Sequence, residues 1–197
     1  MISGGSGFIA AHVLDILLEH GHSVVTTVRS QDKADKIKAA HPGVGKDRLD
    51  FAIVEDIAQE GAFEHAVKSN PPFEAVIHTA SPFHFNTEPS KIKKDLLDPA
   101  IIGTTGVLKA IKKNAPTVKH VVITSSFASI VNAAKGNSWD HTYTEADWNP
   151  ITEEEAVLNP SNGYRGILFL VFMLTNLVLI RNYSFQDLCR KGSLEVR

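Results

Sequence analysis

The sequence has almost no cysteine and no excess of charge. Cys189 is the single cysteine among 197 residues, so neither an internal disulfide nor a cluster of thiolate metal ligands can form. A reducing compartment, the cytoplasm, is therefore expected. The 20 basic and 22 acidic residues give a formal net charge of -2, which argues against the basic surface of a nucleic-acid-binding protein. No N-terminal segment has the composition of a secretory signal.

No apolar run is as long as a membrane span, and no metal-ligand motif occurs. Residues 166–180 contain no charged side chain. A membrane-spanning helix needs about twenty apolar residues, so the run is short for a span and no membrane partner is expected. The nine histidines show no His-Glu-x-x-His or similar spacing, and no metal site is expected. The chain has 197 residues, 43% of them hydrophobic, and is therefore long enough to bury one core without disulfides or metal ions.

Strand-like segments alternate with helical ones along the chain. Residues 23–28 are β-branched almost throughout, which is typical of a strand buried on both faces. Further strands are expected at 49–54, 75–78 and 120–124, and helices at 8–20, 32–40, 60–68 and 91–114. This order predicts an α/β fold, a Rossmann-type doubly wound parallel sheet with helices on both faces. Ligands of such sheets bind beyond the carboxyl ends of the strands, where the following residues fall: Gly4, Arg29, Asp56, His78 and Ser125.

Glycines open the first predicted helix. In the pattern Gly4-x-x-Gly7-x-x-Ala10, small residues permit a tight turn and a close approach of the backbone to a pyrophosphate at the helix N-terminus. A dinucleotide would then contact Gly4, Gly7, Phe8 and Ile9. Taken alone, the pattern is equally typical of a plain connection between strand and helix.

Two cations follow the second predicted strand. An NAD site would place a carboxylate about twenty residues after the glycines, but Arg29 and Lys33 occupy this region. A guanidinium and an ammonium suit a ribose 2'-phosphate, so the pair favours NADP. The alternative is a solvated Arg and Lys at a strand end. Asp56, with Ile57 beside it, lies where such folds hold the adenine, although an aspartate that caps the following helix would occupy the same place.

Several short motifs together resemble one protein family in order and spacing. They are Ser-Gly-Gly-Ser-Gly-Phe-Ile-Ala (3–10), Val-Arg-Ser (28–30), His-Thr-Ala-Ser-Pro-Phe (78–83), Thr-Ser-Ser (124–126), Trp-Asn-Pro (148–150) and Asn-Gly-Tyr-Arg (162–165). Over residues 1–165 the chain resembles an extended short-chain dehydrogenase/reductase of the NAD-dependent epimerase/dehydratase superfamily. Within it, the chain looks like the fungal NADPH-dependent ketone and aldehyde (methylglyoxal-type) reductases related to dihydroflavonol reductase.

The resemblance implies hydride transfer between NADPH and a carbonyl carbon, and it assigns the catalytic residues. Tyr164 is expected to donate the proton and to contact the cofactor, and Ser126 to stabilise the substrate oxygen; Ser125 is the alternative serine. The family places a lysine four residues after the tyrosine, where this chain has Leu168. Phe83 and Phe127 are candidates for lining the substrate pocket or for packing.

The two ends of the chain depart from the family. The first strand is expected to be incomplete and the C-terminal substrate domain to be missing, so residues 1–165 are interpreted as a partial NADP-binding Rossmann domain. When the codons of residues 184–195 are read in a shifted frame, one allowed choice gives Ala-Ser-Lys-Thr-Phe-Ala-Glu-Lys-Ala-Ala-Trp, the family's continuation after Tyr-Arg. Residues 166–197 are therefore interpreted as an aberrant apolar tail, a translated intron followed by a frameshifted exon.

The sequence thus predicts an NADPH-dependent oxidoreductase that reduces ketones or aldehydes to alcohols, here in a truncated and catalytically impaired form. Its expected partner is a small carbonyl compound. One rival is a nucleotide-sugar epimerase or dehydratase on the same fold, although Arg29 argues against it because those relatives mostly use NAD. The other rival is a non-catalytic protein that binds a cofactor or is tethered to a membrane by the apolar run.

Overall fold

The computed structural model describes residues 1–81, 88–132, 140–144, 146–158 and 161–166, and the chain divides into two units. The first unit comprises Met1–His84 and Asp98–Thr124, and the second Phe85–Leu97 and Ser125–Arg197. All the residues expected to bind the nucleotide, except Tyr164, belong to the first unit. Ser126 and Tyr164 belong to the second.

The first unit contains a parallel sheet of five strands in the order β3-β2-β1-β4-β5. Because the chain moves outward from β1 to β3 and then returns to β4 on the other side, the strand order reverses between β1 and β4. Such a switch point is where ligands of doubly wound sheets bind. The Rossmann-type α/β fold is therefore confirmed. The strands are β1 (Ile2–Ser3), β2 (Val24–Val28), β3 (Leu49–Ile53), β4 (Ala75–His78) and β5 (His120–Ile123).

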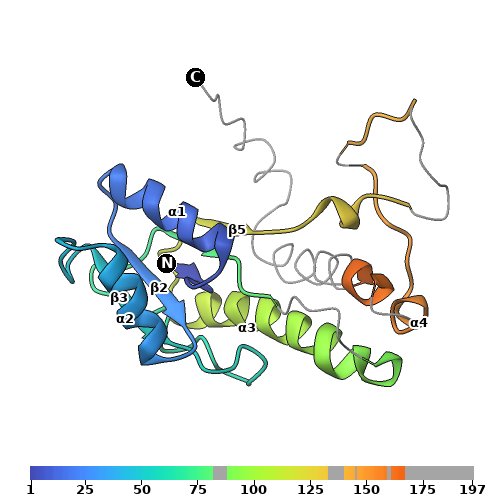
Figure 1. Ribbon diagram of the computed structural model, residues 1–197, viewed down its shortest axis with the longest axis horizontal. Helices are drawn as coiled ribbons and strands as arrows, with labels where there is room; N and C mark the ends of the chain where they lie inside the picture. The colour runs from blue at the N-terminus through green and yellow to red at the C-terminus, as the bar shows by residue number, and fades with distance from the viewer. Residues whose placement is uncertain (82–87, 133–139, 145, 159–160, 167–197) are drawn as a thin grey trace. The chain divides into compact units, whose positions relative to one another are not determined.

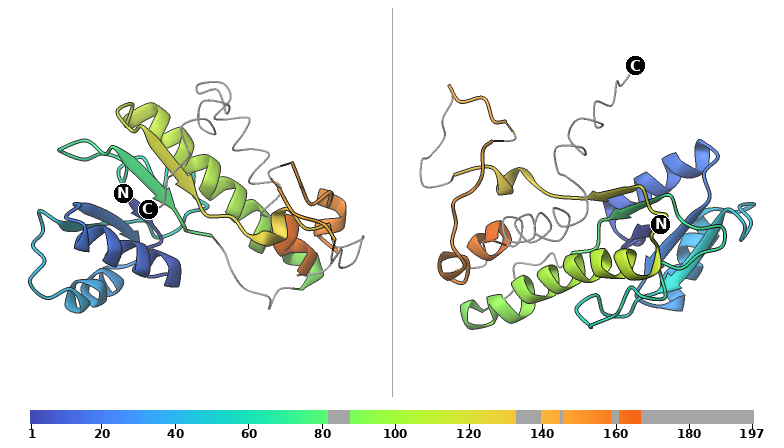
Figure 2. Two further views of the ribbon diagram at one scale, coloured as in Figure 1. Left: turned by 90° about the horizontal axis from the view of Figure 1, so that it is seen from above. Right: turned by 180° about the vertical axis from the view of Figure 1, so that it is seen from behind.

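Three helices connect these strands and cover both faces of the sheet. Helices α1 (Phe8–Glu19) and α2 (Gln31–Ala40) lie on one face and α3 (Asp98–Asn114) on the other (Figures 1 and 2), as right-handed crossovers require. The helical spacing of Ala10, Leu14 and Leu18 turns them toward the sheet, where they form a core cluster with Ile2 and Val24. The predicted alternation of strands and helices thus positions the carboxyl ends of the strands at one edge.

The helix expected at 60–68 is wrong. The structure has a series of turns there, in which most backbone hydrogen bonds span three residues, such as Ala62 N to Gln59 O and Glu64 N to Gly61 O. Gly61 has φ +74°, a left-handed conformation that interrupts a right-handed helix. Phe63 and Val67, whose spacing suggested a helix, are buried by these turns without a continuous helix.

The helix expected at 91–114 begins later than predicted. A 3-10 turn η1 (Pro89–Lys91) and a π-helical turn η2 (Lys93–Leu97) come first, and α3 starts at Asp98. Pro99 explains the break, because it has no N–H to donate to the carbonyl four residues earlier and its ring crowds that carbonyl.

β1 is much shorter than its neighbours, and its start is buried. β2 pairs with β3 over five residues, whereas β1 pairs with β2 only through Ile2 and Thr26. A cavity of about 490 Å³ adjoins Met1, Val24 and Ala75 at this amino edge. The ammonium of Met1 donates a hydrogen bond to Ala75 O at 2.8 Å, and burial lowers its pKa to about 6.

Acetylating the N-terminus is expected to remove a pH dependence of stability. The folded chain binds fewer protons than the unfolded chain between the pKa of about 6 and the ordinary value of 8.0. The free energy of unfolding should therefore rise through this window, by about 2 to 3 kcal/mol. Denaturant titrations from pH 5.5 to 8.5 measure the free energy of unfolding of both forms. The difference between the free chain and the acetylated chain should rise with pH. A difference between the two forms that does not change with pH would contradict the prediction.

The second unit contains short helical elements in its described part. Helix α4 (Glu153–Ala156) begins with a capping box, in which Thr152 Oγ1 accepts from Glu155 N and Glu155 Oε2 accepts from Thr152 N. The turn η3 (Phe127–Ser129) follows the end of β5 in the chain. Among the described residues there is no helix long and apolar enough to cross a membrane, and the apolar run at 166–180 lies almost wholly outside them.

Candidate functional site

The glycine turn, residues 4–7, is hydrogen-bonded to the end of β2 through its backbone N–H groups. Gly4 has φ +74°, and its N–H donates to Thr27 Oγ1 at 3.1 Å, while Gly5 N donates to Thr27 O at 2.8 Å. Gly7 N then donates to Gly4 O at 2.8 Å and closes the turn. The turn therefore lies at the carboxyl edge of the central strand, where the sequence predicts it.

Only glycine fits at the two tightest positions of this turn. A Cβ at Gly5 would lie 2.1 Å from Thr26 Oγ1, and Thr26 is fully buried. A Cβ at Gly4 would lie 3.1 Å from Ala80 Cα, on a residue already in the left-handed region. The sequence pattern singled out Gly4 and Gly7 but missed Gly5, whose need for glycine arises from a side chain on another strand.

The N-terminus of α1 has no side-chain cap. Its N-cap is Gly7, which has no side chain to accept a hydrogen bond from the first turn, and that turn contains no acidic residue. Phe8 and Ile9 stand beside it with 81% and 53% of their surface exposed. A helix N-terminus with free N–H groups and a positive dipole end attracts an anion such as a pyrophosphate.

Arg29 and Lys33 both lie near the carboxyl end of β2. Arg29 follows the last strand residue, Lys33 is in the first turn of α2, and both are exposed. Within the part of the chain that the structure describes, neither side chain forms an ion pair or a hydrogen bond. By contrast, Lys36 on the same helix is paired with Asp32 at 3.0 Å. The two cations are therefore available to an anionic group.

Asp56 and Ile57 have structural contacts of their own. Asp56 Oδ1 accepts a hydrogen bond from Ala58 N at 2.8 Å, which closes a local turn after β3. The Cδ1 atom of Ile57 lies 3.0 Å from where a Cβ on Gly103 would stand, so Ile57 packs closely on α3. Their contact with an adenine stays a prediction.

Ser126 is the N-cap of η3 in the second unit. Its Oγ accepts a hydrogen bond from Ala128 N at 3.3 Å, so the hydroxyl proton remains available for donation. Asn149, which is 3% exposed, fixes this turn: its Nδ2 donates to Ala128 O at 3.0 Å and its N–H to Ser129 O at 2.8 Å. The Trp-Asn-Pro motif thus has a physical role, to hold the backbone that carries Ser126.

Tyr164 lies in a helical segment at 161–166 and is half-buried. Gly163 in this segment lies so close to Ile92 that a Cβ would approach Ile92 Cγ2 to 2.6 Å. Leu168 and Phe83 lie outside the described residues. Phe127 is 65% exposed and packs edge-on against the ring of Tyr143, with ring centroids 5.4 Å apart.

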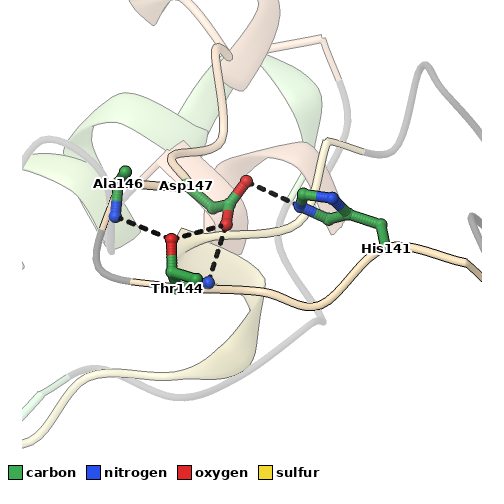
Figure 3. Close-up of polar contacts among 4 residues, drawn as sticks. All are labelled: His141, Thr144, Ala146 and Asp147. Carbon is green, nitrogen blue, oxygen red and sulfur yellow. Dashed lines mark hydrogen bonds and ion pairs between the residues drawn. The ribbon is translucent and has the colours of Figure 1, made fainter.

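A carboxylate that the sequence did not single out organises the loop before Asn149. Asp147 accepts hydrogen bonds from Thr144 N and from His141 Nε2, both at 2.7 Å (Figure 3), and these partners lower its pKa, the Thr144 backbone most. Thr144 Oγ1 in turn accepts from Ala146 N at 3.3 Å. The His141 ring also contacts Tyr143 edge-on. Aspartate and histidine therefore stabilise the loop that carries Tyr143 against Phe127.

In comparison with known proteins, residues 1–165 match the NAD dependent epimerase/dehydratase family. The ketoreductase AzaE of Aspergillus niger is 45% identical over 166 residues, which are 84% of this chain and 47% of that protein. The NADPH-dependent methylglyoxal reductase Gre2 of Saccharomyces cerevisiae is 40% identical over 167 residues, 84% of this chain and 48% of that protein.

Solved structures show the same likeness. The crystal structure of yeast methylglyoxal/isovaleraldehyde reductase Gre2 complexed with NADPH superposes with a TM-score of 0.85 at 36% identity. It covers 92% of this chain and 52% of the yeast chain. The chain therefore spans about half the length of the relatives it matches.

Proposed function

The chain belongs to the NAD dependent epimerase/dehydratase family, and on this premise we propose that it carries the nucleotide-binding part of an NADPH-dependent oxidoreductase that reduces ketones or aldehydes to alcohols. One observation carries the proposal. Gly4 and Gly5 are hydrogen-bonded to Thr27 at the end of β2, and the cations Arg29 and Lys33 follow this strand in the chain. Its relatives include reductases named as NADPH-dependent or solved with NADPH, which agrees with this reading.

The residues of the first unit fit such a dinucleotide. The close approach at Gly4 and Gly5 and the uncapped N-terminus of α1 suit a pyrophosphate, and Phe8 and Ile9 flank that terminus. Arg29 and Lys33 would bind a 2'-phosphate, and Asp56 and Ile57 would lie near the adenine. When bound, NADPH supplies the hydride.

The second unit supplies the groups that act on the carbonyl. The hydroxyl of Tyr164 would donate the proton to the carbonyl oxygen, and the hydroxyl of Ser126 would donate a hydrogen bond to the same atom as negative charge develops. A cation next to the phenol would favour this proton transfer, because it stabilises the phenolate that remains after donation. The family's lysine, which would supply it, is absent from this chain at Leu168.

The loss of that lysine is explained if residues 166–197 are a translated intron followed by a frameshifted exon. The codons of Gly166-Ile167 can supply a splice donor, and those of Tyr183-Ser184 an acceptor. The family match ends at residue 165, which agrees with this boundary. In the spliced product an alanine would replace Gly166. Its methyl group would lie 2.4 Å from Ala156 Cβ, so the 161–166 segment must shift away from α4.

Sequencing of mature transcripts across this junction tests the splicing hypothesis. We expect a spliced message in which Tyr164-Arg165 is followed by Ala-Ser-Lys in frame, because this order restores the lysine four residues after the tyrosine. Uninterrupted coding sequence from residue 166 to 184 in all mature messages would refute it. Amplification from genomic DNA is the matched control, because it must contain the segment in either case.

The proposed function is tested by NADPH oxidation in the presence of small aldehydes and ketones, with the spliced product as the enzyme. A small carbonyl compound is thus the proposed partner, and the cytoplasm is the proposed location because the single cysteine suits a reducing compartment. The second candidate, a nucleotide-sugar epimerase or dehydratase, would instead show a preference for NAD. Binding of NADP without any turnover would favour a non-catalytic protein.

A further inference from the structure

A buried histidine stands at the switch point of the sheet and has no role in the proposed chemistry. His78 is the last residue of β4, only 2% exposed, and is paired in register with Ser3 of β1. Its Nδ1 lies 2.8 Å from Ser3 Oγ and its Nε2 lies 3.4 Å from Thr104 Oγ1 of α3. The ring of Phe63 packs against it edge-on, with centroids 5.7 Å apart. Its surroundings therefore contain hydroxyl groups and an aromatic ring.

The hydrogen bonds of Ser3 determine which way the proton between these two side chains points. Ser3 Oγ accepts from Thr79 N at 3.0 Å and from Ala80 N at 3.1 Å. A hydroxyl oxygen has two lone pairs and one proton, so both lone pairs are in use and the proton is left to donate to His78 Nδ1. His78 must then be the neutral tautomer that carries its proton on Nε2, which can donate to Thr104. The burial of the ring, which lowers its pKa to about 4, agrees with a neutral imidazole.

The same hydroxyl fixes the chain beside the glycine turn. Thr79 Oγ1 donates back to Ser3 O at 2.6 Å, so residues 79 and 80 are held to β1 by three hydrogen bonds. Ala80 is the residue that a Cβ on Gly4 would touch, at 3.1 Å. A shift of Ala80 would therefore change the space directly against the turn that approaches the nucleotide.

We infer that His78 is a positioning residue for dinucleotide binding: by accepting the proton of Ser3 it directs that hydroxyl to hold Thr79 and Ala80 beside Gly4. The inference rests on the proposed function, because it assumes that the glycine turn binds the nucleotide. His78 itself touches no nucleotide in this scheme. It acts through Ser3 and the backbone of residues 79 and 80.

Substitution of His78 tests the inference through rescue. His78→Leu removes the acceptor, so the Ser3 proton must turn to another partner and release one backbone N–H. We expect the Kd for NADPH to rise about 10-fold, the effect of one buried unsatisfied donor. His78→Asn keeps an acceptor near the position of Nδ1 and should return the Kd to within about threefold of the parent. Equal affinity in the leucine variant and the parent would overturn the inference.

A measurement on the unsubstituted chain keeps the test independent of variant folding and of NADPH binding. The ¹⁵N chemical shifts of the His78 ring at neutral pH should report an unprotonated Nδ1 and a protonated Nε2. A proton on Nδ1 would overturn the inference even if NADPH binds. If the parent chain shows this tautomer but no affinity for NADPH, the proposed function has failed while the hydrogen-bond scheme stands.

Discussion

The product of the spliced transcript is expected to oxidise NADPH with a small aldehyde or ketone, whereas the 197-residue chain should show no turnover above background. The reason is the phenol of Tyr164. Donation of its proton leaves a phenolate anion, and this chain has Leu168 where the family's lysine would stabilise that anion. The spliced product regains a lysine four residues later, which is on the same face of a helix.

Tyr164→Phe in the spliced product should lower kcat by about 10²- to 10⁴-fold, the usual contribution of a positioned proton donor. NADPH affinity should change much less, because the nucleotide is held mainly by the first unit. Tyr143→Phe is the matched control: its ring contacts with Phe127 and His141 do not need the hydroxyl, so kcat should stay within about twofold of the parent. An active Tyr164→Phe variant would contradict the assignment of the proton donor.

The sheet could be predicted because its signals are local. Segments such as 23–28 are β-branched almost throughout, and helices such as α1 repeat apolar residues at helical spacing, so each element can be recognised from its own residues. The two predicted helices that differ from the structure, at 60–68 and 91–114, each contain one residue whose backbone does not fit the helix that the apolar spacing predicts. Gly61 adopts a left-handed conformation within an apolar repeat, and Pro99 delays α3 until Asp98.

Only those parts of the candidate site that have local signals could be predicted. Arg29 and Lys33 could be placed from the strand that precedes them. The requirement for glycine at Gly5 could not, because it comes from Thr26 on the adjacent strand. The Ser3 and His78 pair was equally hidden, since the two residues are 75 positions apart and meet only through the register of β1 and β4. Register across a parallel sheet is a tertiary property that one sequence does not display.

Neutralising Arg29 and Lys33 is expected to abolish the preference of the chain for NADPH over NADH. Charge-assisted hydrogen bonds contribute about 1.5 to 3 kcal/mol, so Arg29→Ala should raise the Kd for NADPH by about 10- to 150-fold. Lys33→Ala should have a smaller effect, because an ammonium acts as a point charge and its exposed position is screened by salt. Neither change should alter the Kd for NADH more than about threefold. Titration calorimetry of the parent and both variants with both nucleotides, at one fixed ionic strength, measures the six Kd values.

Lys38→Ala separates a local contact from an effect of net charge. Lys38→Ala removes one positive charge, as the Arg29 and Lys33 changes do. Lys38 is on the helix that carries Lys33, but in the last turn of α2, away from the carboxyl end of β2. If Lys38→Ala weakens NADPH binding as much as Arg29→Ala does, the attraction is a general one and the two residues do not form a phosphate site. If the parent chain instead prefers NADH, Arg29 and Lys33 do not select NADPH, and the epimerase or dehydratase alternative is favoured. Only a loss confined to NADPH and to Arg29 and Lys33 connects these two cations with the 2'-phosphate, because that group is the sole chemical difference between the two nucleotides.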